Sequence, residues 1–217
     1  MSVKREKQKR LSKAAGCLAV FVLWTAVVTV VDVQAIGPMG SSVGLATING
    51  FVHRLTGVHT ALYVMTDWLS LIPAFFMLGF ACLGLAQWIR RKSIALVDRS
   101  ILALGGFYVL VLAAYVLFEV LVINYRPVLI EGALEASYPS STTMLVLCVM
   151  PTAMMQMKVR IKSVPLRRCV VWMMAVYTAG MVVFRLLSGV HWLSDIIGGI
   201  GLSAGLVSLY SVFSGME

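Results

Sequence analysis

A histidine and an aspartate four residues apart are the side chains in this sequence whose types and spacing most directly predict chemistry. His191 and Asp195 lie in the stretch FRLLSGVHWLSD, which also contains Arg185. On a helix, residues at i and i+4 share one face, so the carboxylate can hold one ring nitrogen and leave the other free to attack a substrate. The guanidinium of Arg185 can fork onto phosphate oxygens and neutralise charge in a transition state. The segment therefore predicts nucleophilic chemistry on an anionic group.

Two further segments carry groups that suit an anion. Arg126 precedes a proline in NYRPVL, and Ser140 and Ser141 follow a proline in YPSSTT, where an apolar run begins. Free amides and the helix dipole favour an anion at such a helix start. Each feature taken alone has an ordinary structural explanation, since Pro-Ser-Ser is a common helix start and lone arginines often cap helices or bind lipid headgroups. An isolated His-x3-Asp is likewise more often a structural pair, so the combination carries the prediction.

Membrane-spanning helices are the elements that must position these groups. Of the 217 residues, 60% are hydrophobic and only 12% are charged, which is too apolar for a soluble domain of this size. The sequence predicts an all-α polytopic bundle with spans near residues 14–31, 68–89, 101–123, 141–157, 170–187 and 192–213. A less apolar stretch, residues 41–63, separates the first two spans and is expected to lie along the membrane interface or against the bundle.

The first apolar run has a rival interpretation as a signal peptide, because Val33–Ala35 resembles a cleavage site. The run is long enough to span a bilayer, which favours a retained anchor. We therefore expect residues 1–217 to form a single membrane-embedded domain, with residues 1–13 as a basic cytoplasmic segment.

Positive charges orient the predicted bundle. Lysines and arginines gather within residues 1–13, 90–99 and 158–168, and all three clusters fall on one side of a six-span arrangement. The positive-inside rule then places both termini in the cytoplasm of a multi-pass cell-membrane protein. The net charge of +9 is explained by this orientation, so nucleic acid is not an expected partner. The opposite, extracytoplasmic side receives the candidate site together with Arg54, Arg126 and Arg185.

Metal and disulfide chemistry are not expected. The four cysteines sit singly in or beside apolar runs, without paired spacing, at Cys17, Cys82, Cys148 and Cys169. With only three histidines in the chain, a zinc cluster is not expected either. We predict neither a metal nor another cofactor.

The three segments together resemble the signature motifs of the type 2 phosphatidic acid phosphatase superfamily. That family has K-x6-R-P, then P-S-G-H, then S-R-x5-H-x3-D, and both the order and the spacing Arg185-x5-His191-x3-Asp195 match. The six-span outline with its motifs on one face also fits. The resemblance implies a lipid phosphatase in which His191 forms a phosphohistidine that water cleaves without a metal. It implies phosphate binding by Arg126, Ser140, Ser141 and Arg185.

Four positions depart from the family pattern. Glu119 stands where the family usually has lysine, and Phe184 replaces the serine before the second arginine. Ser141 stands where glycine is frequent. Thr142 replaces the histidine that normally protonates the leaving oxygen, which threonine cannot do near neutral pH. The resemblance thus implies a site that has its nucleophile but not its usual acid.

Three explanations of Thr142 stay open. The leaving group can be a phosphate, as in a lipid diphosphate such as a polyprenyl diphosphate, which needs less protonation than an alkoxide. Another residue can be the acid. Glu119 is one candidate, although it can instead pair with Arg126. His53 and His59 are two others, although histidines in such a segment more often pack at the interface. The protein can also be a catalytically silent member of the fold that binds lipid phosphates or partner proteins.

Of these possibilities, we expect first an enzyme that hydrolyses a lipid phosphate or diphosphate at the outer membrane face. Membrane lipid is its expected partner. A transporter is disfavoured because the spans lack matched, discontinuous repeats. The glycine-rich run Gly198–Gly205 permits close helix packing, but its neighbour can belong to this chain or to another, so the oligomeric state stays open.

Overall fold

The computed structural model describes residues 3–214, so the first two and last three residues of the predicted domain lie outside the described part. The described residues form eight α-helices: α1 (Val3–Val30), α2 (Ala46–Thr56), α3 (Thr60–Leu69), α4 (Leu71–Arg91), α5 (Arg99–Val120), α6 (Ser141–Arg160), α7 (Val164–Leu187) and α8 (Leu193–Phe213). Two single turns of 3-10 helix, η1 (Pro38–Gly40) and η2 (Ile94–Leu96), lie in the connections.

Six helical stretches of the described chain are long and apolar enough to cross a bilayer, which confirms the predicted six-span, all-α bundle. They are Arg5–Val30, Thr60–Arg91, Arg99–Val120, Ser141–Arg160, Val164–Leu187 and Leu193–Phe213. The second span starts earlier than predicted, because α3 and α4 form it together. Polar residues in α3 lower the hydropathy of this part of the span, so its start is hard to recognise in the sequence. In the structure Thr66 is fully buried and Asp67 lies toward Arg185 of α7.

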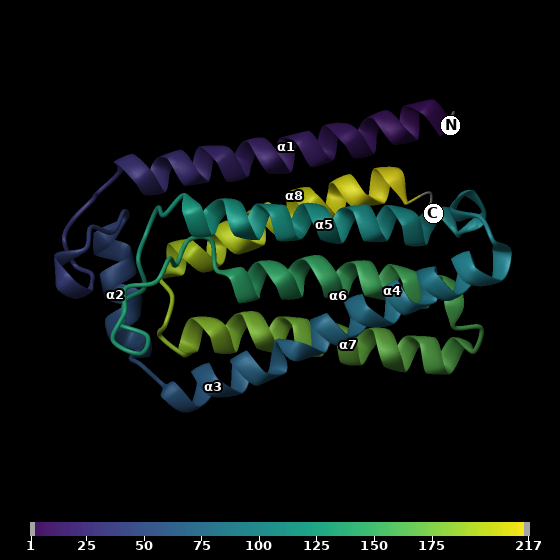
Figure 1. Cartoon of the computed structure of the whole chain (residues 1–217). Helices are drawn as coiled ribbons and strands as arrows, with labels where there is room; N and C mark the ends of the chain where they lie inside the picture. Colours follow the sequence, from purple (N-terminus) through teal and green to yellow (C-terminus); the bar gives the residue numbers. More distant parts are fainter. Residues whose placement is uncertain (1–2, 215–217) are drawn as a thin grey trace.

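The segment predicted to lie along the interface, residues 41–63, is only partly a separate element. Its helix is α2, whereas residues 60–63 already belong to the second span. Figure 1 shows α2 across the end of the bundle where α1 ends. Asn49 on α2 donates to the carbonyl of Gly44 at 2.8 Å and to the hydroxyl of Ser194 at 2.9 Å, and it accepts from the Ser194 amide at 3.0 Å. This helix therefore braces the start of α8.

The spacing of glycines on α8 answers the question that the sequence left open about its neighbour. A Cβ added at Gly199 would lie 3.2 Å from the carbonyl oxygen of Ser140, and one at Gly205 would lie 2.5 Å from the side chain of Leu18. The glycine face thus packs against α1 and the start of α6 of the same chain. Close approach of these helices brings α8 against the loop that precedes α6.

Both ends of the described chain lie at one end of the bundle, opposite α2 (Figure 1). The α4–α5 and α6–α7 connections, which carry the other basic clusters, lie at the same end. At that end Asp98 pairs with Arg91 at 3.0 Å and with Arg160 at 3.5 Å, which ties α5 to α4 and α6. The cytoplasmic location of this end stays a prediction from the positive-inside rule.

Replacing Asn49 by alanine is expected to lower the free energy of unfolding by about 1–3 kcal/mol, because the exchange leaves the Ser194 amide and the Gly44 carbonyl buried without these partners. Thermal unfolding in detergent measures the change. The neighbouring variant Ile48→Ala is the control, since Ile48 is half exposed and makes no such bond among the described contacts. Equal stability of Asn49→Ala and wild type would contradict the bracing role of α2.

Candidate functional site

The candidate residues converge at the end of the bundle that α2 crosses. Arg126 lies in the loop after α5, Ser140 at the start of α6, Arg185 in the last turn of α7, His191 in the α7–α8 connection and Asp195 in the first turn of α8. All five are buried. The Ser140 amide donates to the Asp195 carbonyl oxygen at 3.0 Å, which joins the start of α6 directly to the start of α8.

The hydroxyl of Ser137 lies between His191 and Asp195. The ring nitrogen Nδ1 of His191 is 3.9 Å from the carboxylate oxygen Oδ2 of Asp195, which is too far for a hydrogen bond. Ser137 Oγ is 3.0 Å from that Nδ1 and donates to the same Oδ2 at 2.5 Å. The direct carboxylate–imidazole contact expected from the i, i+4 spacing is therefore replaced by a serine bridge.

The start of α8 explains this difference. His191 precedes the first helical residue, so the two side chains do not share a helical face. The carboxylate of Asp195 instead accepts the backbone amide of Trp192 at 2.9 Å and caps the helix. Asn124 and Ser194 donate to its other oxygen at 3.1 and 3.3 Å. Asp195 is thus a buried carboxylate surrounded by neutral donors.

His191 presents a free ring nitrogen. Because Ser137 donates its proton to Asp195, its oxygen accepts from Nδ1–H of His191, which leaves the lone pair on Nε2. Nε2 is buried and has no hydrogen-bond partner among the described residues. Burial and the nearby charges of Arg126 and Arg185 hold the pKa of His191 well below its ordinary value of 6.5. The imidazole is therefore neutral and has its nucleophilic nitrogen available.

The two arginines are held by residues that the sequence analysis did not single out. Arg185 is 2% exposed; it donates to Thr66 Oγ1 at 3.2 Å, lies 3.8 Å from Asp67, and stacks its guanidinium 5.1 Å from the centre of the Tyr63 ring. All three partners come from α3, the helix that forms the first part of the second span. This helix therefore positions Arg185.

Arg126 pairs with Glu135 in the same loop, with 3.1 Å between Nε and the carboxylate oxygen. The alternative pairing of Arg126 with Glu119 does not occur among the described ion pairs. Glu119 instead lines a small crevice with Tyr115, Ser137 and Ser141. It therefore lies at the same end of the bundle as the candidate site, beside the start of α6.

Several buried polar atoms of this region have no hydrogen-bond partner within the described chain. They are Arg126 Nη1, Ser140 Oγ, Thr143 Oγ1, Arg185 Nε, His191 Nε2 and Arg126 Nε, the last of which has only its ion pair with Glu135. Buried polar groups in folded proteins are nearly always paired, so a group of orphans calls for an explanation. The guanidinium groups of Arg126 and Arg185, whose charges act on the His191 ring, and Ser140, whose amide bonds to Asp195, offer a donor set that suits a phosphate group.

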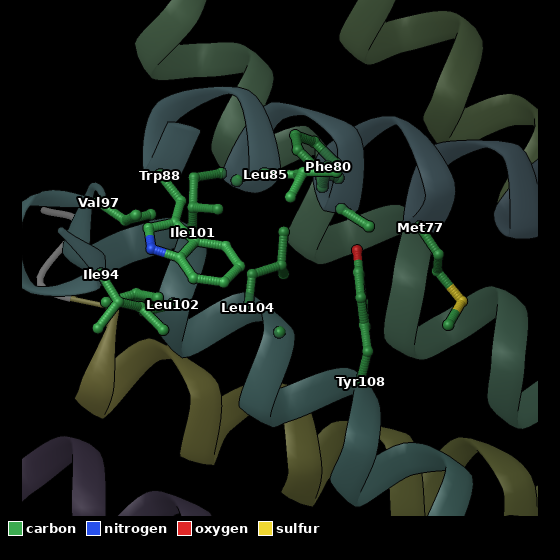
Figure 2. A pocket seen from close by; sticks show the side chains of 13 residues that line it. Met77, Phe80, Leu85, Trp88, Ile94, Val97, Ile101, Leu102, Leu104 and Tyr108 are labelled. Carbon is green, nitrogen blue, oxygen red and sulfur yellow. The ribbon is translucent and has the colours of Figure 1, made fainter. Parts of the chain in front are cut away.

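An apolar cavity opens beside these residues. Ser141 and Thr142 line a space of about 270 Å³ between α4, α5 and α6, together with Ser70 and mostly apolar side chains. Met77 and Tyr108 belong both to this space and to a second cavity of about 290 Å³ between α4 and α5. Figure 2 shows Phe80 and Trp88 of α4 across that second cavity from Leu104 and Tyr108 of α5. The two cavities extend from Thr142 toward the opposite end of the bundle.

The remaining histidines have structural contacts. His53 Nε2 is 3.1 Å from the Gly189 carbonyl, and its ring lies 5.3 Å from that of Trp192. His59 Nε2 is 2.9 Å from the Thr56 carbonyl. Both contacts are packing contacts of the kind expected from the sequence. Within the described residues, no group of three or more His, Cys, Asp or Glu side chains could hold a metal ion.

Besides the partners of the arginines, sequence reasoning missed Asn124 and Ser137, which bond to Asp195. Asn124 begins the segment NYRPVL, two residues before Arg126, and Ser137 directly precedes YPSSTT, three residues before Ser140. In a chain this apolar, polar residues next to a candidate motif were the available signal.

Comparison with known proteins bears on the overall fold and on the sequence segment that carries the motifs. The sequence model of the PAP2 superfamily matches residues 123–216, the stretch that carries all three motifs. The crystal structure of a transmembrane PAP2 type phosphatidylglycerolphosphate phosphatase from Bacillus subtilis is similar, with a TM-score of 0.57 over 92% of this chain and 94% of that chain, at 19% sequence identity. A search of curated protein sequences found no match. In the sequence of residues 123–216 and in its fold, this six-span chain is therefore similar to membrane phosphatases of the PAP2 superfamily.

Proposed function

We propose that this protein hydrolyses a lipid diphosphate through a phosphohistidine formed on His191. The observation that carries the proposal is the set of unpartnered donors around a neutral imidazole whose Nε2 is free. A phosphate group held by Arg126, Ser140 and Arg185 would satisfy these donors and present its phosphorus to the nitrogen. The proposal keeps the nucleophilic role of His191 and three of the four phosphate-binding residues expected from the sequence. The fourth, Ser141, lines the adjoining cavity.

The reaction proceeds in two displacements. Nε2 of His191 attacks phosphorus, the bond between phosphorus and the leaving oxygen breaks, and the two arginines neutralise charge on the transferred group. Water then attacks phosphorus and the N–P bond breaks, which releases inorganic phosphate and restores the imidazole. A proton of that water passes to solvent or to the released phosphate.

The proposed leaving group rests on Thr142. An alkoxide leaving group needs a proton, and threonine cannot supply one near neutral pH. A lipid monophosphate leaving from a diphosphate is a much weaker base, so it departs without an acid at this position. Glu119 beside Ser141 is the alternative source of a proton.

The adjoining cavities support a lipid substrate. Their walls are mostly apolar, and they begin at Ser141 and Thr142, beside the phosphate-binding donors. A hydrocarbon chain placed there would leave contact with water, which stabilises it by about 25 cal/mol per Å² of buried surface. A polyprenyl or acyl tail fits this environment, whereas a soluble phosphate ester would leave it unfilled. By the charge asymmetry, the site faces the extracytoplasmic side of the cell membrane.

The direct test uses two lipids with the same tail. Purified protein in detergent receives a polyprenyl diphosphate or the corresponding monophosphate, and released phosphate is measured. Release from the diphosphate in preference to the monophosphate, lost in His191→Ala, would support the proposal. Saturable binding that depends on Arg126 and Arg185 without release from either lipid would replace it by a catalytically silent lipid-phosphate binder, for which the absent histidine at Thr142 is the favouring observation.

The pH dependence of hydrolysis follows from the lowered pKa of His191. The nucleophile is the neutral imidazole, so a pKa below 6.5 keeps it active at pH values where an ordinary histidine is protonated. The charged groups near it are Arg126, Arg185 and, through Ser137, Asp195. We expect the acidic limb of kcat/KM that belongs to His191 to have its midpoint below pH 6.5. A midpoint at or above that value would contradict the environment described for His191.

A further inference from the structure

We propose that Ser137 is a positioning residue whose hydroxyl orients the nucleophile by linking His191 to Asp195. The inference deepens and rests on the proposed function, because it assigns a role within the same reaction. Nothing in the spacing of the motifs requires such a link, since an aspartate four residues after a histidine can reach the ring directly.

The distances exclude a direct hydrogen bond between the pair. Nδ1 of His191 is 3.9 Å from Oδ2 of Asp195, whereas the Ser137 oxygen is 3.0 Å from Nδ1 and 2.5 Å from that same Oδ2. All three side chains are at most 3% exposed. Water therefore does not compete for these bonds, and the serine is the only described group that joins the ring to the carboxylate.

The direction of the two bonds determines the tautomer of His191. A buried carboxylate accepts, so the Ser137 proton points to Asp195 and the serine oxygen accepts Nδ1–H from the ring. A proton on Nδ1 leaves Nε2 with its lone pair, which is the form required of the nucleophile. As the N–P bond forms at Nε2, the ring gains positive charge, and Nδ1–H strengthens its bond toward the serine and the carboxylate behind it. The Nδ1 proton remains on the ring throughout.

The backbone around Ser137 is held on both sides, so the hydroxyl is preorganised. Its amide donates to the Asn124 carbonyl at 2.9 Å. The next residue, Tyr138, is 1% exposed, and its hydroxyl lies 2.6 Å from Thr25 Oγ1 of α1. The Tyr138 ring packs against Gly198, where an added Cβ would come within 2.5 Å of it. The glycine face of α8 and the tyrosine together fix the serine where the ring needs it.

The competing explanation is that Ser137 only stabilises the fold. Ser194 provides a matched control, because its hydroxyl also donates to the Asp195 carboxylate, at 3.3 Å, without contacting His191. A structural role predicts that Ser137→Ala and Ser194→Ala have similar consequences. A positioning role predicts that only the Ser137 variant alters the ring of His191.

The kinetic test compares Ser137→Ala, Ser137→Thr and Ser194→Ala on the lipid diphosphate. Loss of a charge-assisted hydrogen bond that strengthens in the transition state is expected to lower kcat on the order of 10- to 100-fold in Ser137→Ala, with KM little changed. Ser137→Thr keeps a hydroxyl and is expected to recover most of that loss. An equal fall in Ser194→Ala, or kcat of Ser137→Ala within about 3-fold of wild type, would overturn the assignment.

A spectroscopic test separates this inference from the proposed function, because it needs no turnover. Protein labelled with ¹⁵N at histidine reports the tautomer of each ring, and His191→Gln identifies the signals of His191. Wild type is expected to show the Nδ1–H tautomer at His191, and Ser137→Ala is expected to lose it. Absence of hydrolysis together with this Ser137-dependent tautomer would refute the proposed function and leave the link intact. The same tautomer in both proteins, or Nε2–H in wild type, would refute the link.

Discussion

Phosphate release from the lipid diphosphate is expected to fall on the order of 10⁴-fold or more when His191 is replaced by alanine, because the substitution removes the attacking nitrogen itself. The donors that bind phosphate remain, so KM is expected to change much less than kcat. Wild-type protein quenched during turnover of a substrate labelled on its terminal phosphate is expected to carry acid-labile, base-stable phosphate. The His191→Ala protein is expected to carry none.

His53→Ala is the matched control for this result. His53 lies at the same end of the bundle as His191 and packs against Trp192, the residue after His191. Its Nε2, however, contacts the backbone carbonyl of Gly189. We expect this variant to lose stability and to retain turnover within roughly 10-fold, because no interaction with the reacting phosphate is removed. Comparable losses in both variants, or covalent phosphate that persists without His191, would assign the chemistry to another group.

Monophosphate hydrolysis is expected to rise by about 100-fold in Thr142→His, because an imidazole there can protonate an alkoxide leaving group. Thr142 lines the cavity next to Ser141 and is 9% exposed, so under the proposed function the new ring would lie near the reacting group and away from bulk water. Hydrolysis of the diphosphate is expected to change little, since its leaving group needs no such help. Initial rates on the two lipids with matched tails measure the ratio.

Thr142→Gln separates proton donation from shape. Glutamine is close to histidine in size and can donate a hydrogen bond, yet it cannot transfer a proton near neutral pH. A gain confined to the histidine variant would show that an acid is what the site lacks. If the wild type already cleaves the monophosphate and Glu119→Gln abolishes that activity, Glu119 supplies the proton and the leaving-group argument from Thr142 is refuted.

Much of the fold could be predicted from the sequence, because long apolar runs can satisfy their backbone groups within a bilayer only as helices. All six spans were predicted, and their boundaries were less accurate where polar residues face a neighbouring helix. Thr66 and Asp67 lower the apparent hydropathy of α3, although both lie toward Arg185. Hydropathy counts residue types, whereas the bilayer is in contact only with the outward face of each helix.

The motif residues of the candidate site were also identified from the sequence, since arginine, serine, histidine and aspartate are rare in apolar spans and their order along the chain carries information. Their supporting contacts were not. Ser137 lies 58 positions from Asp195 along the chain, and Arg185 lies 119 positions from Thr66. No periodicity relates such residues, because they meet only after the helices have packed.

The sequence by itself determined that this is a six-span membrane protein whose basic clusters lie at one end and whose three candidate motifs share the other. Only the tertiary structure decided how the side chains of His191 and Asp195 are connected. The i, i+4 spacing predicted direct contact, but α8 begins after His191 and the Asp195 carboxylate caps it by accepting the Trp192 amide. That cap leaves a gap of 3.9 Å between carboxylate and ring, and the close packing of α8 against the loop before α6 places Ser137 within it.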